Sequence, residues 1–166
     1  MYNLTSLSFA IHYNKERYVD VILTKAQENG ILQDILASRN IVQYLNIIAY
    51  TLTPLNFAIY KGNNKCINSI FIRVQNSDTL RNILTSKDIV QLPGVTYVIK
   101  PFAFAIHKGN IECINSIIVR INDIPQYIYA TFQPTAAINE RNTRISSALD
   151  NVSISSRYVR ENSKVN

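Results

Sequence analysis

An internal repeat with a period of 47 or 48 residues is the feature that most constrains the fold of this chain. Residues 57–73 and 104–120 align without a gap, and 12 of the 17 aligned positions are identical. A fainter copy begins at Phe9, and the connecting stretches 35–43 and 83–91 also correspond. Three copies in one register indicate an array in which each unit buries its apolar surface against its neighbours. The sequence therefore predicts a repeat protein.

Each unit has the pattern of two short helices. In the middle unit Thr53 suits the N-cap, and Pro54 suits the first helical position. Gly62 and Gly109 are expected to end the first helix, because glycine adopts a left-handed conformation at little cost. The first unit has Asn14 at this position, and asparagine is the residue type that best replaces glycine there. A second helix follows, with apolar residues at i, i+1, i+4 and i+5: Cys66, Ile67, Ile70 and Phe71 in the middle unit, Cys113, Ile114, Ile117 and Ile118 in the third, and Tyr18, Val19, Ile22 and Leu23 in the first.

The start of the middle unit resembles a known repeat signature. Residues 53–58 read Thr-Pro-Leu-Asn-Phe-Ala, and Gly62 follows four residues later. This resembles the ankyrin signature T-P-L-H-x-A with its helix-ending glycine, with Asn56 in place of the histidine. Residues 100–105 keep Pro and Ala, and residues 5–10 keep Thr, Leu and Ala. The resemblance extends over about residues 1–125 and implies an all-α solenoid of helical hairpins, with short β-hairpin fingers as an open option.

The repeat period departs from that family, whose units run to about 33 residues. The excess of about 15 residues lies between one helix pair and the next. Asp78 can cap an additional short helix there. Residues 89–92 and 95–98 flank Pro-Gly and could form a β-hairpin. The matching stretch 41–52 has no Pro-Gly and could instead be helical, so a divergent α-solenoid of another type stays open.

The repeat signal ends before the chain does. We expect the ankyrin-like array to occupy residues 1–133, with units that start near residues 5, 53 and 100. Residues 134–166 are rich in Ser, Asn, Thr and Arg and predict a polar tail, either disordered or with a weak capping helix over 136–149. The formal net charge of +6 is spread over the array and the tail, so no segment concentrates it.

The sequence contains no catalytic constellation. A Gly-rich phosphate loop, a nucleophile elbow and metal-ligand spacing are all absent from it. We therefore predict that the chain is not an enzyme and uses no cofactor, metal or small-molecule substrate. Cys66 and Cys113 occupy equivalent positions in successive units. Packed helices lie about 8–10 Å apart, beyond the roughly 7 Å reach of a disulfide, so we expect buried packing thiols.

Targeting signals are also missing from the sequence. No run approaches the roughly 20 apolar residues of a membrane span. The first residues lack the basic and apolar regions of a secretory signal, and two cysteines do not form a disulfide framework. These features favour a cytoplasmic protein with no membrane contact, and delivery into a host cell is left open.

The family resemblance also implies where a partner would bind. In ankyrin repeats the end of the first helix helps to line a concave surface that holds partners. Carried over to this chain, the partner-binding residues are His12, Tyr13, Tyr60, Lys61, His107 and Lys108. Aromatic and cationic side chains suit such a recognition surface. We therefore expect a monomeric, non-enzymatic protein–protein interaction module.

The identity of the partner is open at this level. An acidic protein is the more economical partner for a basic chain with a pI near 9.4. The alternative is a basic nucleic-acid-binding repeat protein, because Lys61 and Lys108 stand in register and could form a positive stripe.

Overall fold

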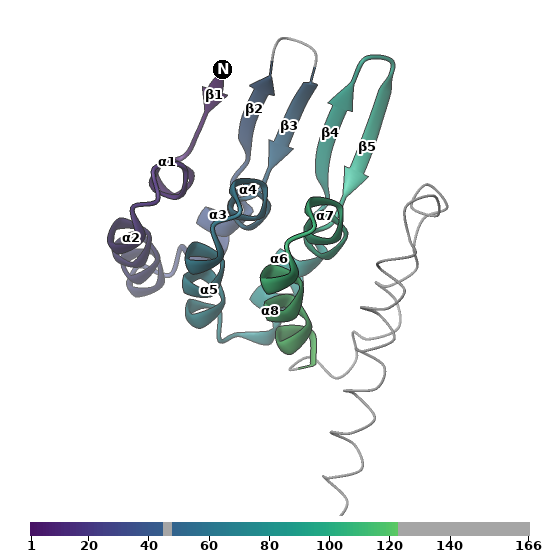
Figure 1. Ribbon diagram of the computed structural model, residues 1–166. Helices are drawn as coiled ribbons and strands as arrows, with labels where there is room; N and C mark the ends of the chain where they lie inside the picture. Colours follow the sequence, from purple (N-terminus) through teal and green to yellow (C-terminus); the bar gives the residue numbers. More distant parts are fainter. Residues whose placement is uncertain (45–47, 123–166) are drawn as a thin grey trace, which may run out of the picture. The chain divides into compact units, whose positions relative to one another are not determined.

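Groups of two or three helices alternate with strands along the chain (Figure 1). The computed structural model describes residues 1–44 and 48–122, which belong to one compact unit. Their elements in chain order are β1 (Tyr2–Asn3), α1 (Ser6–His12), α2 (Glu16–Glu28), α3 (Leu32–Ala37), β2 (Asn40–Tyr44), β3 (Ile48–Leu52), α4 (Pro54–Lys61), α5 (Asn64–Arg73), α6 (Ser77–Thr85), β4 (Asp88–Leu92), β5 (Val95–Ile99), α7 (Pro101–Lys108) and α8 (Ile111–Asn122).

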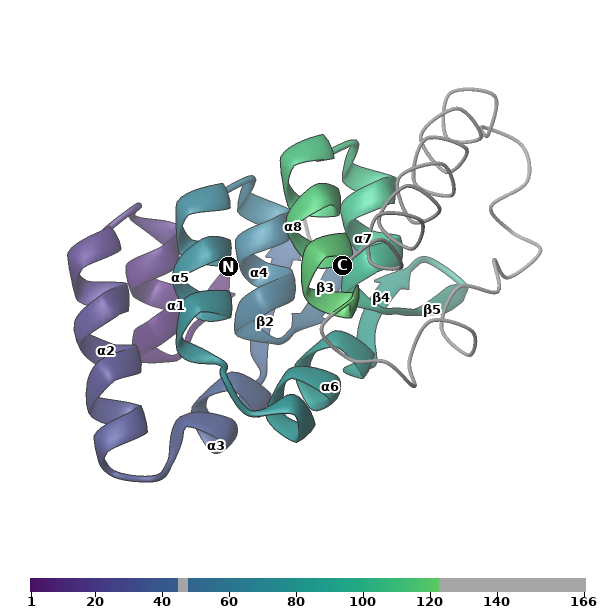
Figure 2. The ribbon, with the colours of Figure 1, turned by 90° about the horizontal axis from the view of Figure 1, so that it is seen from below.

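Equivalent helices of the three units stack side by side. Helices α1, α4 and α7 form an inner row, and α2, α5 and α8 form a second row against it (Figure 1). Helices α3 and α6 contact each other, and Figure 2 shows them at the lower edge of the helix rows. Figure 1 looks nearly along the axes of the inner helices, while the strands extend away from them. The inner helices and the sheet therefore meet at an angle.

The strands form one antiparallel sheet in the order β1-β2-β3-β4-β5. Within the hairpins β2 pairs with β3 and β4 pairs with β5. The two hairpins are then joined by pairing of β3 with β4, in which Tyr50 lies opposite Val90. The predicted all-α fold class is therefore wrong, because the described residues combine eight helices with a five-stranded sheet in a mixed α/β arrangement.

The residues added to each repeat explain this difference. The stretch 41–52, for which a helix was an open prediction, instead contains most of β2 and all of β3. Its β-branched and aromatic residues, such as Ile41, Val42 and Tyr50, favour a pleated, half-buried strand. The stretch 89–98 forms the hairpin that its Pro-Gly predicts, and Gly94 at the turn has a φ of 76°. Successive hairpins then satisfy each other's edges by backbone pairing.

The ends of the inner helices follow the prediction. Gly62 and Gly109 are the C-cap residues of α4 and α7, and both have a φ of 66°. Asn14, which follows α1, has a φ of 53° and is the only non-glycine with positive φ in the described part of the chain. The prediction of a left-handed residue at all three positions is confirmed.

Two predicted helix caps differ in detail. Helix α6 begins at Ser77, and its N-cap is Asn76 rather than Asp78. The Asn76 side chain accepts hydrogen bonds from the backbone N–H groups of Asp78 and Thr79. Thr53 stands at the N-cap of α4 as predicted, but its side chain makes no capping bond.

The core lies among the helices, and the strands add Val42 and Leu52 to it. Ala10, Ala58 and Ala105, which occupy equivalent positions, are all buried in the inner helices. Cys66 and Cys113 are free and fully buried, which confirms their predicted burial. Burial raises the pKa of the Cys66 thiol to about 11 and that of Cys113 to about 12, so both stay protonated at neutral pH.

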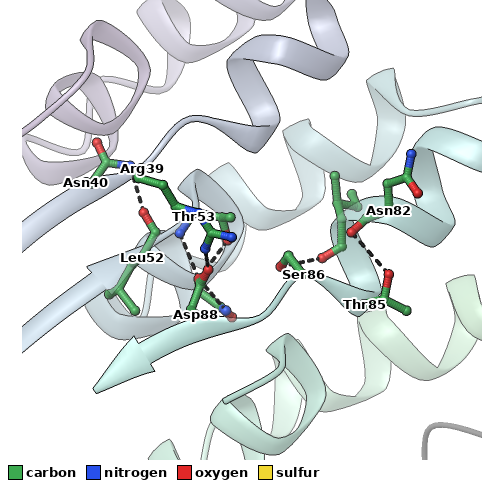
Figure 3. A network of polar contacts seen from close by, with 10 residues as sticks. Arg39, Asn40, Leu52, Thr53, Asn82, Thr85, Ser86 and Asp88 are labelled. Atoms are coloured by element: carbon green, nitrogen blue, oxygen red, sulfur yellow. Dashed lines mark hydrogen bonds and ion pairs between the residues drawn. The ribbon is translucent and has the colours of Figure 1, made fainter. Parts of the chain in front are cut away.

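A buried carboxylate fastens the sheet to the middle helix pair (Figure 3). Asp88 at the start of β4 accepts hydrogen bonds from the backbone N–H of Thr53 at 2.7 Å and from its hydroxyl at 2.9 Å. The amide of Asn56 donates to the same oxygen at 2.6 Å, and Arg39 pairs with the other oxygen. This anion lies at the N-terminus of α4, where the helix dipole and the free N–H groups favour negative charge.

The first unit repeats this contact with a neutral side chain. Asn40 at the start of β2 accepts hydrogen bonds from the Thr5 backbone N–H at 2.9 Å and from the Thr5 hydroxyl at 3.1 Å. Its amide also donates to the carbonyl of Leu52. Each finger therefore begins with a residue that binds the start of an inner helix.

Asparagine side chains also connect neighbouring units. Asn63 caps α5 by accepting from the Cys66 N–H, and its amide donates to the Asn14 side chain at 2.9 Å. Asn110 does the same one unit later, since it accepts from the Cys113 N–H and donates to Asn64 at 2.8 Å. These bonds fix the spacing between units. The predicted array boundary at residue 133 and the predicted tail 134–166 lie outside the described residues.

Candidate partner-binding surface

A row of tyrosine and valine side chains crosses the sheet on the face that looks toward the inner helices. Strand register places Tyr2 opposite Val42, Val42 opposite Tyr50, Tyr50 opposite Val90, and Val90 opposite Tyr97. Because side chains alternate between the two faces of a strand, these five residues share one face. The ring contacts described next place that face toward the inner helices.

An aromatic band joins this row to the inner helices. The rings of Tyr2 and His12 lie 4.6 Å apart, and those of Tyr50 and Tyr60 lie 5.1 Å apart. Phe57 connects the two pairs, with its centroid 6.2 Å from His12 and 6.3 Å from Tyr60. Such tilted and offset rings attract one another beyond simple area burial. We define the aromatic band as Tyr2, His12, Tyr13, Tyr50, Phe57, Tyr60 and Phe104.

Lys108, which comes from the third unit, lies over three rings of the band. Its ammonium nitrogen lies 4.7 Å from the centroid of Tyr60, 5.6 Å from Phe104 and 6.0 Å from Tyr50. Partial loss of water lowers the pKa of Lys108, while the ring faces favour its charged form. The cation is thus held in place by three rings, and its remaining side is open to a partner.

The six residues predicted from the repeat divide into two groups. His12, Tyr13 and Tyr60 belong to the aromatic band, in which the rings of His12 and Tyr13 meet edge to face with centroids 4.8 Å apart, and Lys108 lies against the band. Lys61 is exposed, and it is close enough to His12 for its positive charge to lower the pKa of the His12 imidazole. His107 is exposed, and none of the ring contacts in the described part of the chain involves it.

Exposed carboxylates are segregated from this surface. The exposed or half-buried acidic residues in the described part of the chain lie on α2, α3, α6 and α8: Glu16, Asp20, Glu28, Asp34, Asp78 and Glu112. The inner helices and the strands contain one carboxylate, Asp88, which is fully buried and paired. As far as the described residues form it, the surface between the inner helices and the sheet, which we call the inner surface, therefore presents the tyrosine and histidine rings of the band, Lys61 and Lys108 without an exposed acid.

His12 is a titratable group of this surface whose pKa is shifted by its surroundings. Burial lowers the pKa of its imidazole, and the positive charge of Lys61 lowers it further. Its Nδ1 is buried without a hydrogen-bond partner among the described residues, so a proton there would have no acceptor. His12 is therefore neutral at pH 7.

We expect His12 to make stability pH-dependent in the mildly acidic range. Below the ordinary histidine pKa of about 6.5 the unfolded chain binds a proton that the folded chain resists, so stability falls as pH decreases. Thermal unfolding of the wild type between pH 7.5 and 5.5 should show this fall, and His12→Gln should reduce it. The exposed His107→Gln variant is the matched control and should keep the wild-type slope. An equal slope in wild type and His12→Gln would contradict the assignment.

Sequence reasoning missed the part of the surface that comes from the strands. Tyr2 and Tyr50 were not singled out, because neither lies in the helical repeat that guided the prediction. One signal was available: Tyr50 and Tyr97 are separated by 47 residues, which is the repeat period. Read as strand residues, they would have predicted one tyrosine per finger on a common face.

Comparison of the chain with protein-family models, with curated proteins and with solved structures found no match. None of the described helices is long and apolar enough to cross a membrane. Within residues 1–44 and 48–122, no three His, Cys, Asp or Glu side chains gather in a way that could hold a metal ion.

Proposed function

We propose that this chain is a non-enzymatic protein-interaction module whose inner surface binds an acidic protein partner. The observation that carries the proposal is the segregation of charge: the inner surface combines an aromatic band with Lys61 and Lys108, and the exposed carboxylates of the described residues lie on other elements. Aromatic side chains supply large contact area with little conformational freedom to lose. Complementary charge then steers an acidic partner to this side.

The repeat framework supports the same function. Buried helix rows and the asparagine bonds between units hold the rings of three units in fixed positions. A preordered surface loses little entropy on binding, which suits recognition of a partner. Helix pairs whose first helix ends at a left-handed residue, and which alternate with β-hairpins, also support a proposed relationship to ankyrin repeats, with a longer period.

A matched pair of triple variants tests the proposal. The site variant is Tyr60→Ala with Lys61→Ala and Lys108→Ala. The control is Tyr18→Ala with Lys25→Ala and Lys65→Ala, which removes the same residue types from exposed positions on α2 and α5. Proximity labelling should recover acidic proteins with the wild type and the control, and should lose them with the site variant.

Affinity of a recovered partner should also fall as salt rises, because exposed charge pairs are screened. Melting curves of both variants show whether each remains folded. Recovery of the same partners by the site variant and the wild type would contradict the proposal.

Nucleic-acid binding has less support as an alternative. Stacking platforms need free ring faces beside a stripe of cations. Here Lys108 lies over the rings of Tyr60 and Phe104, and the strands contain no lysine or arginine in the described residues. Titration of fluorescent single-stranded RNA at 50 and 200 mM salt distinguishes the two functions, since phosphate binding weakens steeply over that range.

A further inference from the structure

The two edges of the sheet are built differently. Strand β1 has two residues, and the N-terminal ammonium of Met1 donates a hydrogen bond to the Gln43 carbonyl beside it at 2.8 Å. Strand β5, at the other edge, has five residues, Val95–Ile99, with no charged residue, proline or glycine. Natural edge strands are usually short or carry such protective residues. The edge formed by β5 lacks them.

The pairing of β3 with β4 shows how a strand from another unit binds to an equivalent edge within the sheet. Strand β3 receives β4 from the next unit, with Ala49 opposite Gln91 and Thr51 opposite Ile89. Strand β5 is the repeat equivalent of β3, 47 residues later in the sequence. In the sheet of described residues its other side has no neighbouring strand. The outer side of β5 therefore repeats the backbone edge onto which β4 docks.

Side chains along this edge indicate what would fit. The cross-sheet row alternates tyrosine and valine and ends at Tyr97, which is 45% exposed, whereas Tyr50 in the middle of the row is half-buried. On the opposite face Val98 is 62% exposed. Aromatic and β-branched residues form favourable cross-strand pairs. The row would continue with a β-branched residue opposite Tyr97.

We propose that the outer edge of β5 is a docking site for an extended segment of a partner protein, rich in β-branched apolar residues. The segment adds as an antiparallel sixth strand, with a β-branched side chain opposite Tyr97, as Val90 lies opposite Tyr50. Backbone hydrogen bonds supply the affinity, and the alternating side chains supply the specificity for the sequence of the segment. Tyr97 belongs to the row that faces the inner helices, but the strand would bind to the backbone edge of β5 and not to Lys61 or Lys108, so this proposal does not depend on the acidic-partner proposal.

The sequence of β4 itself provides the probe. An acetylated and amidated peptide with the sequence of residues 86–93 is titrated into the full-length, ¹⁵N-labelled chain, and amide shifts are followed by NMR. We expect saturable shifts at Val95–Ile99. N-methylation at alternate peptide residues distinguishes backbone pairing from non-specific apolar contact. The N–H groups of a strand point alternately to its two edges, so only every second one can bond to β5.

Two methylated peptides are compared, one methylated at the positions of Ile89 and Gln91, the other at those of Val90 and Leu92. One of the two should bind about tenfold more weakly or worse, because it loses the hydrogen bonds of the ladder, while the other binds like the parent. Val98→Lys at the edge should weaken binding. Ile41→Lys, which is exposed on the same sheet face but in an interior strand, should not. Lys61→Ala with Lys108→Ala should also leave peptide binding unchanged, whether or not the acidic-partner proposal holds.

Several results would overturn the proposal. One is the absence of shifts in β5 at high peptide concentration, and another is equal binding by both methylated peptides. Slow hydrogen exchange, in the peptide-free monomer, of the β5 amides that point away from β4 would mean that the chain's own residues occupy the edge. A dimer that the peptide dissociates would mean that a second copy occupies it.

Discussion

Replacing Ile67 by aspartate should abolish the cooperative unfolding transition of the chain. Ile67 is fully buried on α5 in the middle unit, where α5 contacts both α2 and α8. An unpaired carboxylate at this position costs several kcal/mol, to which the lost apolar burial adds. Domains of this size are stable by about 5–15 kcal/mol in total, and the middle unit connects the other two. Far-UV circular dichroism melts would show a gradual loss of signal in place of a transition.

The equivalent residue of the third unit provides the control. Ile114 has the same sequence context, but it is only half-buried on α8, so an aspartate there can reach water. Ile114→Asp should lower the melting temperature and retain a cooperative transition. The exposed Lys61→Ala should leave the melting temperature unchanged. A wild-type melting curve for Ile67→Asp would show that the stacked-helix core is wrong.

Local signals explain why the helix pairs were predictable. Proline at the first turn and a left-handed residue at the end act within a few residues, so the sequence alone predicts where α4 and α7 begin and end. Asn14 supports the register because it meets the same backbone requirement as glycine. The buried thiols follow from helical spacing alone. These features are independent of the rest of the chain.

The sheet depends on contacts that no local pattern reveals. Strand β3 becomes an interior strand only because β4, about 40 residues later, pairs with it. Residues 41–52 lack a Pro-Gly turn, and the resemblance to a helical repeat favoured an all-α reading of the excess residues. The candidate surface was incomplete for the same reason. His12, Tyr60 and Lys108 come from repeat equivalence, whereas Tyr50 reaches them from the sheet.

The anchor at Asp88 shows most directly how the strands depend on the helices. We expect Asp88→Ala to lower the free energy of unfolding by about 3 kcal/mol, because it leaves buried donors of Thr53 and Asn56 without an acceptor. Asp88→Asn should cost less, about 1 kcal/mol, since one oxygen can still accept from Thr53. Asn40 already serves Thr5 in this way in the first unit. Equilibrium urea unfolding measures both differences.

Arg39 separates the contribution of the ion pair from that of the hydrogen bonds. Its side chain is 44% exposed, so its charge stays partly hydrated and Arg39→Ala should cost about 0.5 kcal/mol or less. The expected order of destabilisation is therefore Asp88→Ala, then Asp88→Asn, then Arg39→Ala. If Arg39→Ala cost as much as Asp88→Ala, the ion pair rather than the cap of α4 would be the anchor. With the predicted order, Asp88 acts by binding the start of α4, which holds β4 beside β3 and keeps Tyr50 against the inner helices.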